Sequence, residues 1–261
     1  MNRIDELIER LCPDGVEYRT LGEIGEFIRG SGIQKKDFVD EGVGCIHYGQ
    51  LYTHYGLSAK ETKSFITKEF ATNKRMAHEG NLVIATTSEN EEDVCRAVAW
   101  LGREDVAVSN DAYIYRHNQN PMYIAYFFNS SSFASQKKPY ITGTKVLRVS
   151  GENLAKIVIP VPPKEIQEEI VKVLDSFAEL EAELEAELEA RRAQYAYYRD
   201  KLLDFGSRGG AFWMPLGEAL VMKAGGSIRA CDIFDVKDEI NSIPCFGGNG
   251  IRGKSSFAEC G

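Results

Sequence analysis

The chain has 261 residues, of which 43% are hydrophobic and 27% are charged, with a formal net charge of −8. This composition fits one large or two ordinary globular domains. No apolar run approaches the roughly 20 residues that cross a membrane, and residues 1–5 lack the apolar core of a secretory signal, so we expect neither a membrane protein nor a secreted one. The six cysteines form no CxxC pair, which indicates reduced thiols in a cytoplasmic protein.

The first 160 residues alternate between short predicted helices and short predicted strands. Residues 3–11 form an amphipathic helix, closed by a turn at 12–15. Residues 121–129 and 131–136 also have helical patterns. Apolar runs between turn residues predict strands at 24–28, 44–48, 82–86, 97–101, 112–116 and 156–160. The mixture predicts an N-terminal helix and turn at 1–15, then an α+β domain with a twisted sheet at 16–160.

The segment 161–205 predicts a long coiled-coil helix, because no Gly or Pro interrupts it after Pro163. A helix over 163–204 would be about 60 Å long and would act as a spacer. Its apolar residues recur mostly every three or four positions, as in a coiled-coil seam that a partner helix covers. The seam consists of Ile166, Ile170, Val173, Phe177, Leu180, Leu184, Leu188, Tyr195, Tyr198 and Leu202.

The sequence before the long helix begins again after it. Leu21-Gly22-Glu23 returns as Leu216-Gly217-Glu218, and Gly30, Ile33 and Asp37 return as Gly225, Ile228 and Asp232, all at an offset of 195. Residues 46–49 are loosely echoed by 244–247, and residues 206–210 suggest a flexible joint. The long period predicts two copies of one domain, of which residues 206–261 are an incomplete second α+β domain.

Five segments carry a resemblance to a known family: Cys12 to Tyr18, Leu21 to Glu23, Thr142 to Val146, Ile159 to Pro163, and Tyr198 to Leu203. They resemble the specificity subunit of Type I restriction-modification systems, which alternates target-recognition domains with long helices. The chain lacks most of the second recognition domain and the second helix of that pattern. We therefore expect a truncated specificity subunit whose long helix is covered by a second copy of the chain.

The resemblance implies a noncatalytic, sequence-specific DNA-recognition subunit. The first domain would read one half of a bipartite double-stranded DNA target, and the long helix would dock methyltransferase subunits. It implies no cofactor in this chain. S-adenosylmethionine would belong to the methyltransferase subunits, and ATP and Mg to a restriction and motor subunit. Two alternatives remain open: a self-contained adenine methyltransferase, and a coiled-coil assembly protein without a DNA role.

The charge distribution refines this expectation. Lys plus Arg against Asp plus Glu is 18 to 20 for residues 1–150, 8 to 13 for 151–210 and 5 to 6 for 211–261. Most of the acidity lies on the long helix, and the first domain is nearly neutral. Because attraction to phosphates dominates nonspecific binding, this domain alone should bind DNA weakly. Most contacts with the DNA backbone would then come from another subunit.

The polar, aromatic segment 48–56 is one candidate for DNA contact, interpreted as a loop. Its candidates are Gln50, Tyr52, Thr53 and His54, because Gln can bond adenine twice and the others can reach groove edges or phosphates. The alternative is a surface hairpin stabilised by its tyrosines. Two further candidates, Lys35 and Lys36, follow Gly30-Ser31-Gly32, which is neither a dinucleotide nor a Walker loop.

Two later loops complete the candidate set. In the first, Thr87, Ser88 and Asn90 follow a strand, although a helix N-cap would explain the hydroxyls equally well. The second runs from Lys137 to Lys145, just ahead of the long helix, where simple solvation is the alternative to backbone contact. Its candidates are Lys138, Thr142, Thr144 and Lys145.

The enzymatic signals are weak. Asn120-Pro121-Met122-Tyr123 lacks the second proline of the Asn-Pro-Pro-Tyr motif of amino-methyltransferases, and no Gly-rich turn for S-adenosylmethionine is found, so a helix start explains it better. Cys45, His47 and His54 do not reach the spacing of a four-ligand metal site. We expect neither a catalytic residue nor a metal site.

Overall fold

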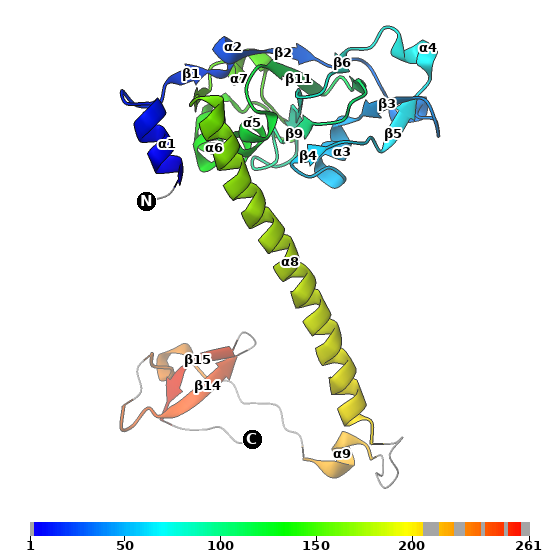
Figure 1. The fold of residues 1–261 in the computed structure, drawn as a ribbon. Helices are drawn as coiled ribbons and strands as arrows, with labels where there is room; N and C mark the ends of the chain where they lie inside the picture. Colours follow the sequence, from blue (N-terminus) through cyan, green and yellow to red (C-terminus); the bar gives the residue numbers. More distant parts are fainter. Residues whose placement is uncertain (1–2, 206–213, 222–227, 236–237, 248–249, 257–261) are drawn as a thin grey trace. The chain divides into compact units, whose positions relative to one another are not determined.

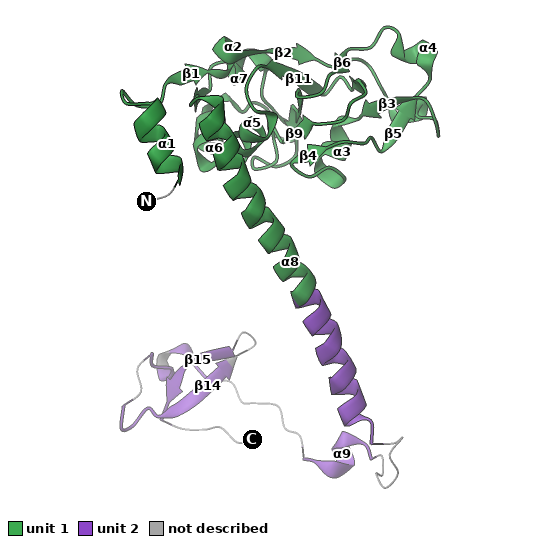
Figure 2. Ribbon diagram, in the orientation of Figure 1, with its two compact units in different colours: residues 1–187 green, residues 188–261 purple. Residues whose placement is uncertain are grey.

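The computed structural model describes residues 3–205, 214–221, 228–235, 238–247 and 250–256. The chain divides into two compact units, residues 1–187 and 188–261 (Figure 2). Strands and helices mix within the first unit, so the predicted α+β class is confirmed. No helix in the described ranges combines the length and apolar character of a membrane span.

A five-stranded sheet forms the centre of the first unit (Figure 1). Its order is β2 (Gly25–Arg29), β11 (Ala112–His117), β7 (Leu82–Ala85), β9 (Ala97–Trp100) and β4 (Ser58–Ala59), and only the β4–β9 pair is parallel. All residues of β7 and β9 are buried, because these apolar runs are covered on both faces. The predicted strands 82–86, 97–101 and 112–116 are thereby confirmed to within one residue at their ends.

A second sheet has four strands in the order β5 (Ser64–Ile66), β3 (Val43–Ile46), β10 (Val106–Val108) and β6 (Met76–Ala77). Here β3 and β10 are parallel. The shorter elements of the unit are α1 (Arg3–Leu11), β1 (Tyr18–Thr20), α2 (Leu21–Ile24), η1 (Lys35–Asp37), α3 (Tyr48–Thr53), α4 (Lys68–Ala71), β8 (Thr87–Ser88), η2 (Lys138–Tyr140), β12 (Leu147–Arg148), α7 (Gly151–Leu154) and β13 (Val158–Pro160).

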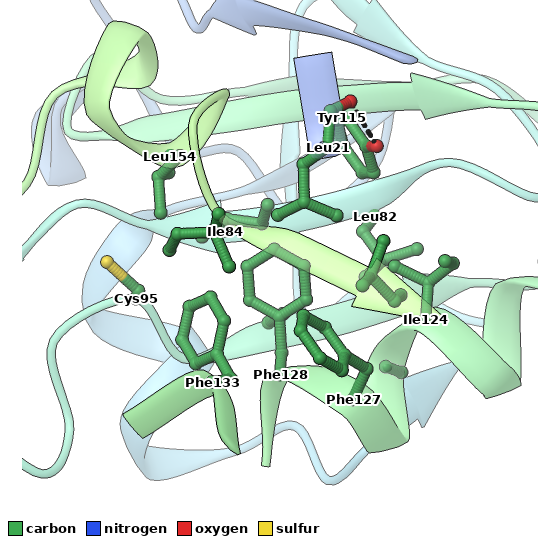
Figure 3. Packing of buried hydrophobic residues seen from close by; sticks show 14 of the residues in the cluster. Leu21, Leu82, Ile84, Cys95, Tyr115, Ile124, Phe127, Phe128, Phe133 and Leu154 are labelled. Carbon is green, nitrogen blue, oxygen red and sulfur yellow. Dashed lines mark hydrogen bonds between the residues drawn. The ribbon is translucent and has the colours of Figure 1, made fainter. Parts of the chain in front are cut away.

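Two helices supply the aromatic part of the main core, α5 (Pro121–Phe128) and α6 (Ser131–Lys137). Phe127, Phe128 and Phe133 pack beneath the aliphatic residues of the sheet (Figure 3). The buried Tyr115 hydroxyl donates to the Leu21 carbonyl oxygen at 2.7 Å, so its polar atom is satisfied inside the core.

The long helix α8 (Lys164–Leu203) has 40 residues and agrees with the predicted range 163–204. Its start is fixed in the first unit by Gln167, whose side chain is fully buried. Gln167 Oε1 accepts from the Asn120 backbone N–H at 3.0 Å, and Nε2 donates to Gln119 Oε1 and the Pro162 carbonyl oxygen, both at 2.8 Å. Three internal partners fit a buried amide, so this junction is satisfied.

The predicted seam of α8 has two different environments, which corrects the interpretation of its first residues. Ile166 is fully buried, and Ile170 packs against the main core. Both were assigned to a partner helix, but they belong to the domain itself. At 100° per residue, all residues of the seam fall within an arc of about 80° around the helix axis, so they share one face. The first turns of that face pack into the core, and from Phe177 onward the face is an exposed stripe.

The second unit contains the end of α8 and α9 (Leu216–Ala219), η4 (Ala230–Asp232), β14 (Ile243–Gly247) and β15 (Gly250–Ser255). Helix α9 repeats α2, and η4 repeats η1, both at the predicted offset of 195. The β14–β15 pair repeats β3–β5: Cys45 faces Ser64, Cys245 faces Gly253, and both cysteines are buried. The predicted echo of 46–49 by 244–247 is therefore shifted by two positions. Gly225 and the joint at 206–210 lie outside the described residues.

Candidate nucleic-acid interface

Three segments that were separate candidates in the sequence line one pocket of about 420 Å³. Helix α3, strand β8 with the turn after it, and the segment 142–148 that includes β12 all contribute lining residues. We call it the Tyr52 pocket, lined by Tyr48, Tyr52, Thr87, Ser88, Glu89, Asn90, Asp111, Val146 and Arg148. The residues come from sequence positions up to 100 apart, so only the fold brings them together.

Residues 48–53 form helix α3, which corrects the predicted loop at 48–56. The helix begins at His47, whose Nδ1 accepts from the Gly49 backbone N–H at 3.3 Å. Gln50 Oε1 accepts from the His47 backbone N–H at 2.9 Å, and Gln50 Nε2 donates to Ser64 Oγ at 2.6 Å. Both ends of the Gln50 amide therefore have partners inside the protein, in a reciprocal cap of the helix start.

The other three candidates of this segment lie in different places. Tyr52 is half-buried and its hydroxyl donates to the Thr87 carbonyl oxygen at 2.8 Å, which ties α3 to β8. Burial raises the pKa of Tyr52, so the hydroxyl is a donor at neutral pH. Thr53 and His54 are exposed at the end of α3, where the Thr53 hydroxyl donates to the Gly49 carbonyl oxygen.

The turn after β8 is held in shape by short-range bonds. Ser88 Oγ accepts from the Asn90 backbone N–H at 3.1 Å, and Asn90 Nδ2 donates to Asp93 Oδ2 at 3.0 Å. Cys95 closes the turn with φ of 71°, in the left-handed region that non-glycine residues rarely adopt. Thr87 is buried, whereas Asn90 is exposed at the pocket rim.

Lys137 supports this turn from beneath and is only 5% exposed, which corrects its placement in a solvent-facing basic loop. Its Nζ donates to the carbonyl oxygens of Glu92 and Val94, both at 2.8 Å. Burial lowers the pKa of Lys137. Lys138 is exposed, and its Nζ lies 3.6 Å from Glu91 Oε1, so part of its charge is balanced locally.

The segment 142–148 is a narrow hairpin beside the pocket. The Arg148 backbone N–H donates to the Thr142 carbonyl oxygen at 2.8 Å, and Arg148 pairs with Thr87 of β8. Gly143 has φ of +102°, and a Cβ there would lie 2.1 Å from the Val146 carbonyl oxygen, so only glycine fits the turn. Thr144 and Lys145 are thereby exposed at the tip.

Arg148 was missed among the candidates. It lines the pocket together with Asp111, which was also missed. The sequence did contain a signal for Arg148: it is the next basic residue after the candidate Lys145, and it directly precedes Val149, which is buried. No local pattern marks Asp111, which reaches the pocket because the Thr86 backbone N–H donates to its carbonyl oxygen.

Lys35 and Lys36 are exposed on η1, outside the residues that line the pocket. The positive charge of Lys35 adds to burial in lowering the pKa of His47, so this lysine lies within electrostatic reach of the start of α3. Other cations pack around the same loop: Lys74 Nζ donates to the Gly32 carbonyl oxygen and Arg75 to the Arg29 carbonyl oxygen. Such clusters form from distant positions and are invisible in the sequence pattern.

The exposed part of the α8 seam extends from Phe177 to Leu202. Phe177 is 63% exposed, Leu184 66% and Tyr195 70%, and Val173 at the edge of the domain is partly buried. The remaining exposed members are Leu180, Leu188, Tyr198 and Leu202. An apolar stripe of this length is typical of a surface that another chain covers.

Asn120 starts α5 as a cap, since its Oδ1 accepts from the backbone N–H groups of Met122 and Tyr123. The structure therefore assigns Asn120-Pro121 to a helix start, as the sequence predicted. Among the described residues, no group of three or more His, Cys, Asp and Glu side chains could hold a metal ion.

Comparison with known proteins identifies the family of this chain. Residues 13–190 match the type I restriction modification DNA specificity domain. The chain belongs to this family. It is 42% identical over 144 residues to the EcoprrI specificity subunit of Escherichia coli, covering 49% of this chain and 35% of that protein. It is 31% identical over 144 residues to a putative type I specificity subunit of Mycoplasma pneumoniae, covering 50% of this chain and 42% of that protein.

The fold also matches a solved structure. A chain from a type I R-M system, studied for complex assembly and conformational transition, aligns with a TM-score of 0.56 and 16% identity. The alignment covers 77% of this chain and 49% of that one. The resemblance that the sequence suggested is thereby confirmed at the level of family and fold. The matched part of this chain spans 35% and 42% of the length of these two curated relatives.

Proposed function

We propose that this chain is a noncatalytic DNA-recognition subunit of a type I restriction-modification complex. The first unit reads one half of a bipartite target. The observation that carries the proposal is the family match over residues 13–190, within which three candidate segments converge on the Tyr52 pocket. Base edges are read by side chains with fixed backbones, and β8, β12 and α3 supply such backbones.

Phosphate contact is assigned to exposed cations around that pocket. Lys145 lies at the tip of the hairpin 142–148, and Lys35 and Lys36 lie on η1. Because the domain is nearly neutral and few of its cations are free to contact phosphates, the chain alone has a low affinity for DNA. The methyltransferase subunits then supply most of the backbone contacts.

The exposed stripe of α8 is assigned to assembly. It docks methyltransferase subunits and a second copy of this chain, and the helix sets the distance between the two recognition units. The methyltransferase subunits carry S-adenosylmethionine and methylate adenine, while a restriction subunit uses ATP and Mg. The part that this chain itself plays is DNA contact, through the hydroxyl, amide and charged side chains of its described residues.

The test is DNA binding by the full chain reconstituted with type I methyltransferase subunits, after methylated adenines have revealed the target. Target and scrambled duplexes are compared across a salt series. If Lys145 holds one phosphate, Lys145→Ala weakens both duplexes similarly and reduces the slope of log affinity against log salt by about 1. Lys60→Ala, at a separate pocket beside Trp100, is the matched control and leaves the slope unchanged.

Three outcomes contradict the proposal in different ways. Equal affinity of the wild-type complex for target and scrambled duplexes would leave the coiled-coil assembly protein as the better account. Tight binding of S-adenosylmethionine by the isolated chain would favour a self-contained methyltransferase. An unchanged salt slope for Lys145→Ala would remove that residue from the DNA surface.

A further inference from the structure

The Tyr52 pocket is lined by three charged side chains, and of these the Asp111 carboxylate also lies within electrostatic reach of His47. Within the described residues, the side chains of Arg148, Glu89 and Asp111 make no hydrogen bond and no ion pair. Opposite charges in one pocket normally pair when they can reach each other. Here they are held apart, which leaves a guanidinium and carboxylates available to an external ligand.

Two consecutive residues place the opposite charges. Thr86 donates its backbone N–H and its hydroxyl to the Asp111 carbonyl oxygen, at 3.0 and 3.1 Å. Thr87 pairs with Arg148 across β8 and β12. The backbones of Asp111 and Arg148 are therefore held by two consecutive residues, Thr86 between β7 and β8 and Thr87 at the start of β8. Glu89 instead lies in the turn after β8, so its carboxylate is less constrained.

The charges that line the pocket limit the class of ligand that it can bind. A phosphate would be repelled by the two carboxylates, and a metal cation by the guanidinium. The major-groove edge of a G·C pair matches both signs, because guanine presents the acceptors O6 and N7 and cytosine presents the N4 amine as a donor. Arg is the commonest specific partner of guanine, and a carboxylate is the acceptor suited to cytosine.

Resting on the proposed function, we propose that the Tyr52 pocket reads one G·C pair of the target half-site. Arg148 donates to guanine O6 and N7, and Asp111 accepts from cytosine N4. Ser88 and Asn90 at the rim serve the neighbouring position. Asp111 and Arg148 are thus specificity-determining residues, whereas the cations outside the pocket contact the backbone without regard to sequence.

The experiment selects duplexes from a randomised pool with the full chain and type I methyltransferase subunits, and maps the methylated sites. The wild-type half-site contains a fixed G·C pair. Arg148→Ala makes that single position degenerate, with a loss of discrimination of about 5- to 150-fold, and Arg148→Lys, which lacks the two-pronged donor, retains part of it. Asp111→Asn relaxes the same position. Lys60→Ala, in the separate pocket beside Trp100, leaves the selected sequence unchanged.

The outcomes separate this inference from the proposed function. A wild-type complex that selects no sequence overturns the proposed function itself. A selective complex whose half-site has no G·C pair, or whose Arg148→Ala and Arg148→Lys variants select the wild-type sequence, overturns the inference alone. The paired variants also guard against misfolding, because Arg148→Lys keeps the charge and the stem. Relaxation by Glu89→Gln, with Asp111→Asn unchanged, would overturn the assignment of Asp111.

Discussion

His117 is a histidine that the fold keeps neutral. Its Nδ1 accepts from the Gln119 backbone N–H at 3.2 Å, while its buried Nε2 has no hydrogen-bond partner among the described residues. Burial lowers the pKa of His117 from 6.5 to about 4. Between these values the unfolded chain binds a proton here that the folded chain does not, so the free energy of unfolding falls as the pH falls.

We expect the wild-type chain to lose about 1–2 kcal/mol more stability than His117→Gln between pH 7 and pH 5. Gln retains an acceptor for the Gln119 N–H and has no proton to gain. Urea unfolding at pH 7, 6 and 5 measures the difference, with His54→Gln at an exposed position as the control. Parallel curves for wild type and His117→Gln would show that another group governs acid stability.

For other single residues, the sequence predicted the polar candidates but not their bonding partners. Residue types identified Tyr52, Thr87, Ser88 and Asn90 as polar candidates, and the structure brings them together around one pocket. The partners of Gln50 and Lys137 could not be predicted, because Ser64 and the Glu92 and Val94 carbonyl groups meet them only in the fold. Arg148 joins the pocket through a strand pairing that spans about 60 positions.

At the scale of elements, local periodicity located α8 because 40 residues repeat one pattern without a breaker. The same periodicity could not say which part of the seam the domain itself buries. Tyr126 donates to Asp175 Oδ1 at 2.7 Å, and Arg10 lies 2.7 Å from Glu165, so contacts with α5 and α1 hold the first turns of the helix. Beyond them the apolar face is exposed.

That exposed face yields a prediction about assembly. Replacing Leu184 and Leu188 by Lys places two charges on the stripe and should abolish self-association and binding of methyltransferase subunits, while the first unit stays folded. Ala182→Lys with Ala186→Lys adds the same charge to the opposite side of the helix and should have little effect. Light scattering and co-purification measure the result. A monodisperse Leu184→Lys, Leu188→Lys double variant with unchanged assembly would contradict the role of the stripe.

At the scale of the whole molecule, the internal repeat is partly readable in the sequence. The offset of 195 correctly aligned α9 with α2 and η4 with η1, because Leu-Gly-Glu and the spaced Asp are local signatures. The looser echo of 46–49 by 244–247 was wrong by two positions, because the strand pairings align Cys245 with Cys45. Strand pairs depend on long-range contacts, so their register is fixed by the fold and not by a short motif.

The symmetry of the target follows from the proposed assembly. When two copies of this chain pair through α8 around a two-fold axis, both present the same first unit with the same Tyr52 pocket. Identical readers related by such an axis require inverted half-sites, separated by a gap that neither unit contacts. We therefore expect the methylated sites to be palindromic with a nonspecific spacer. Sequencing of methylated adenines after exposure of DNA to the reconstituted complex measures this. An asymmetric site would mean that this chain acts beside a different second recognition unit, and the chain's copy number in the complex, measured by mass, would then be one.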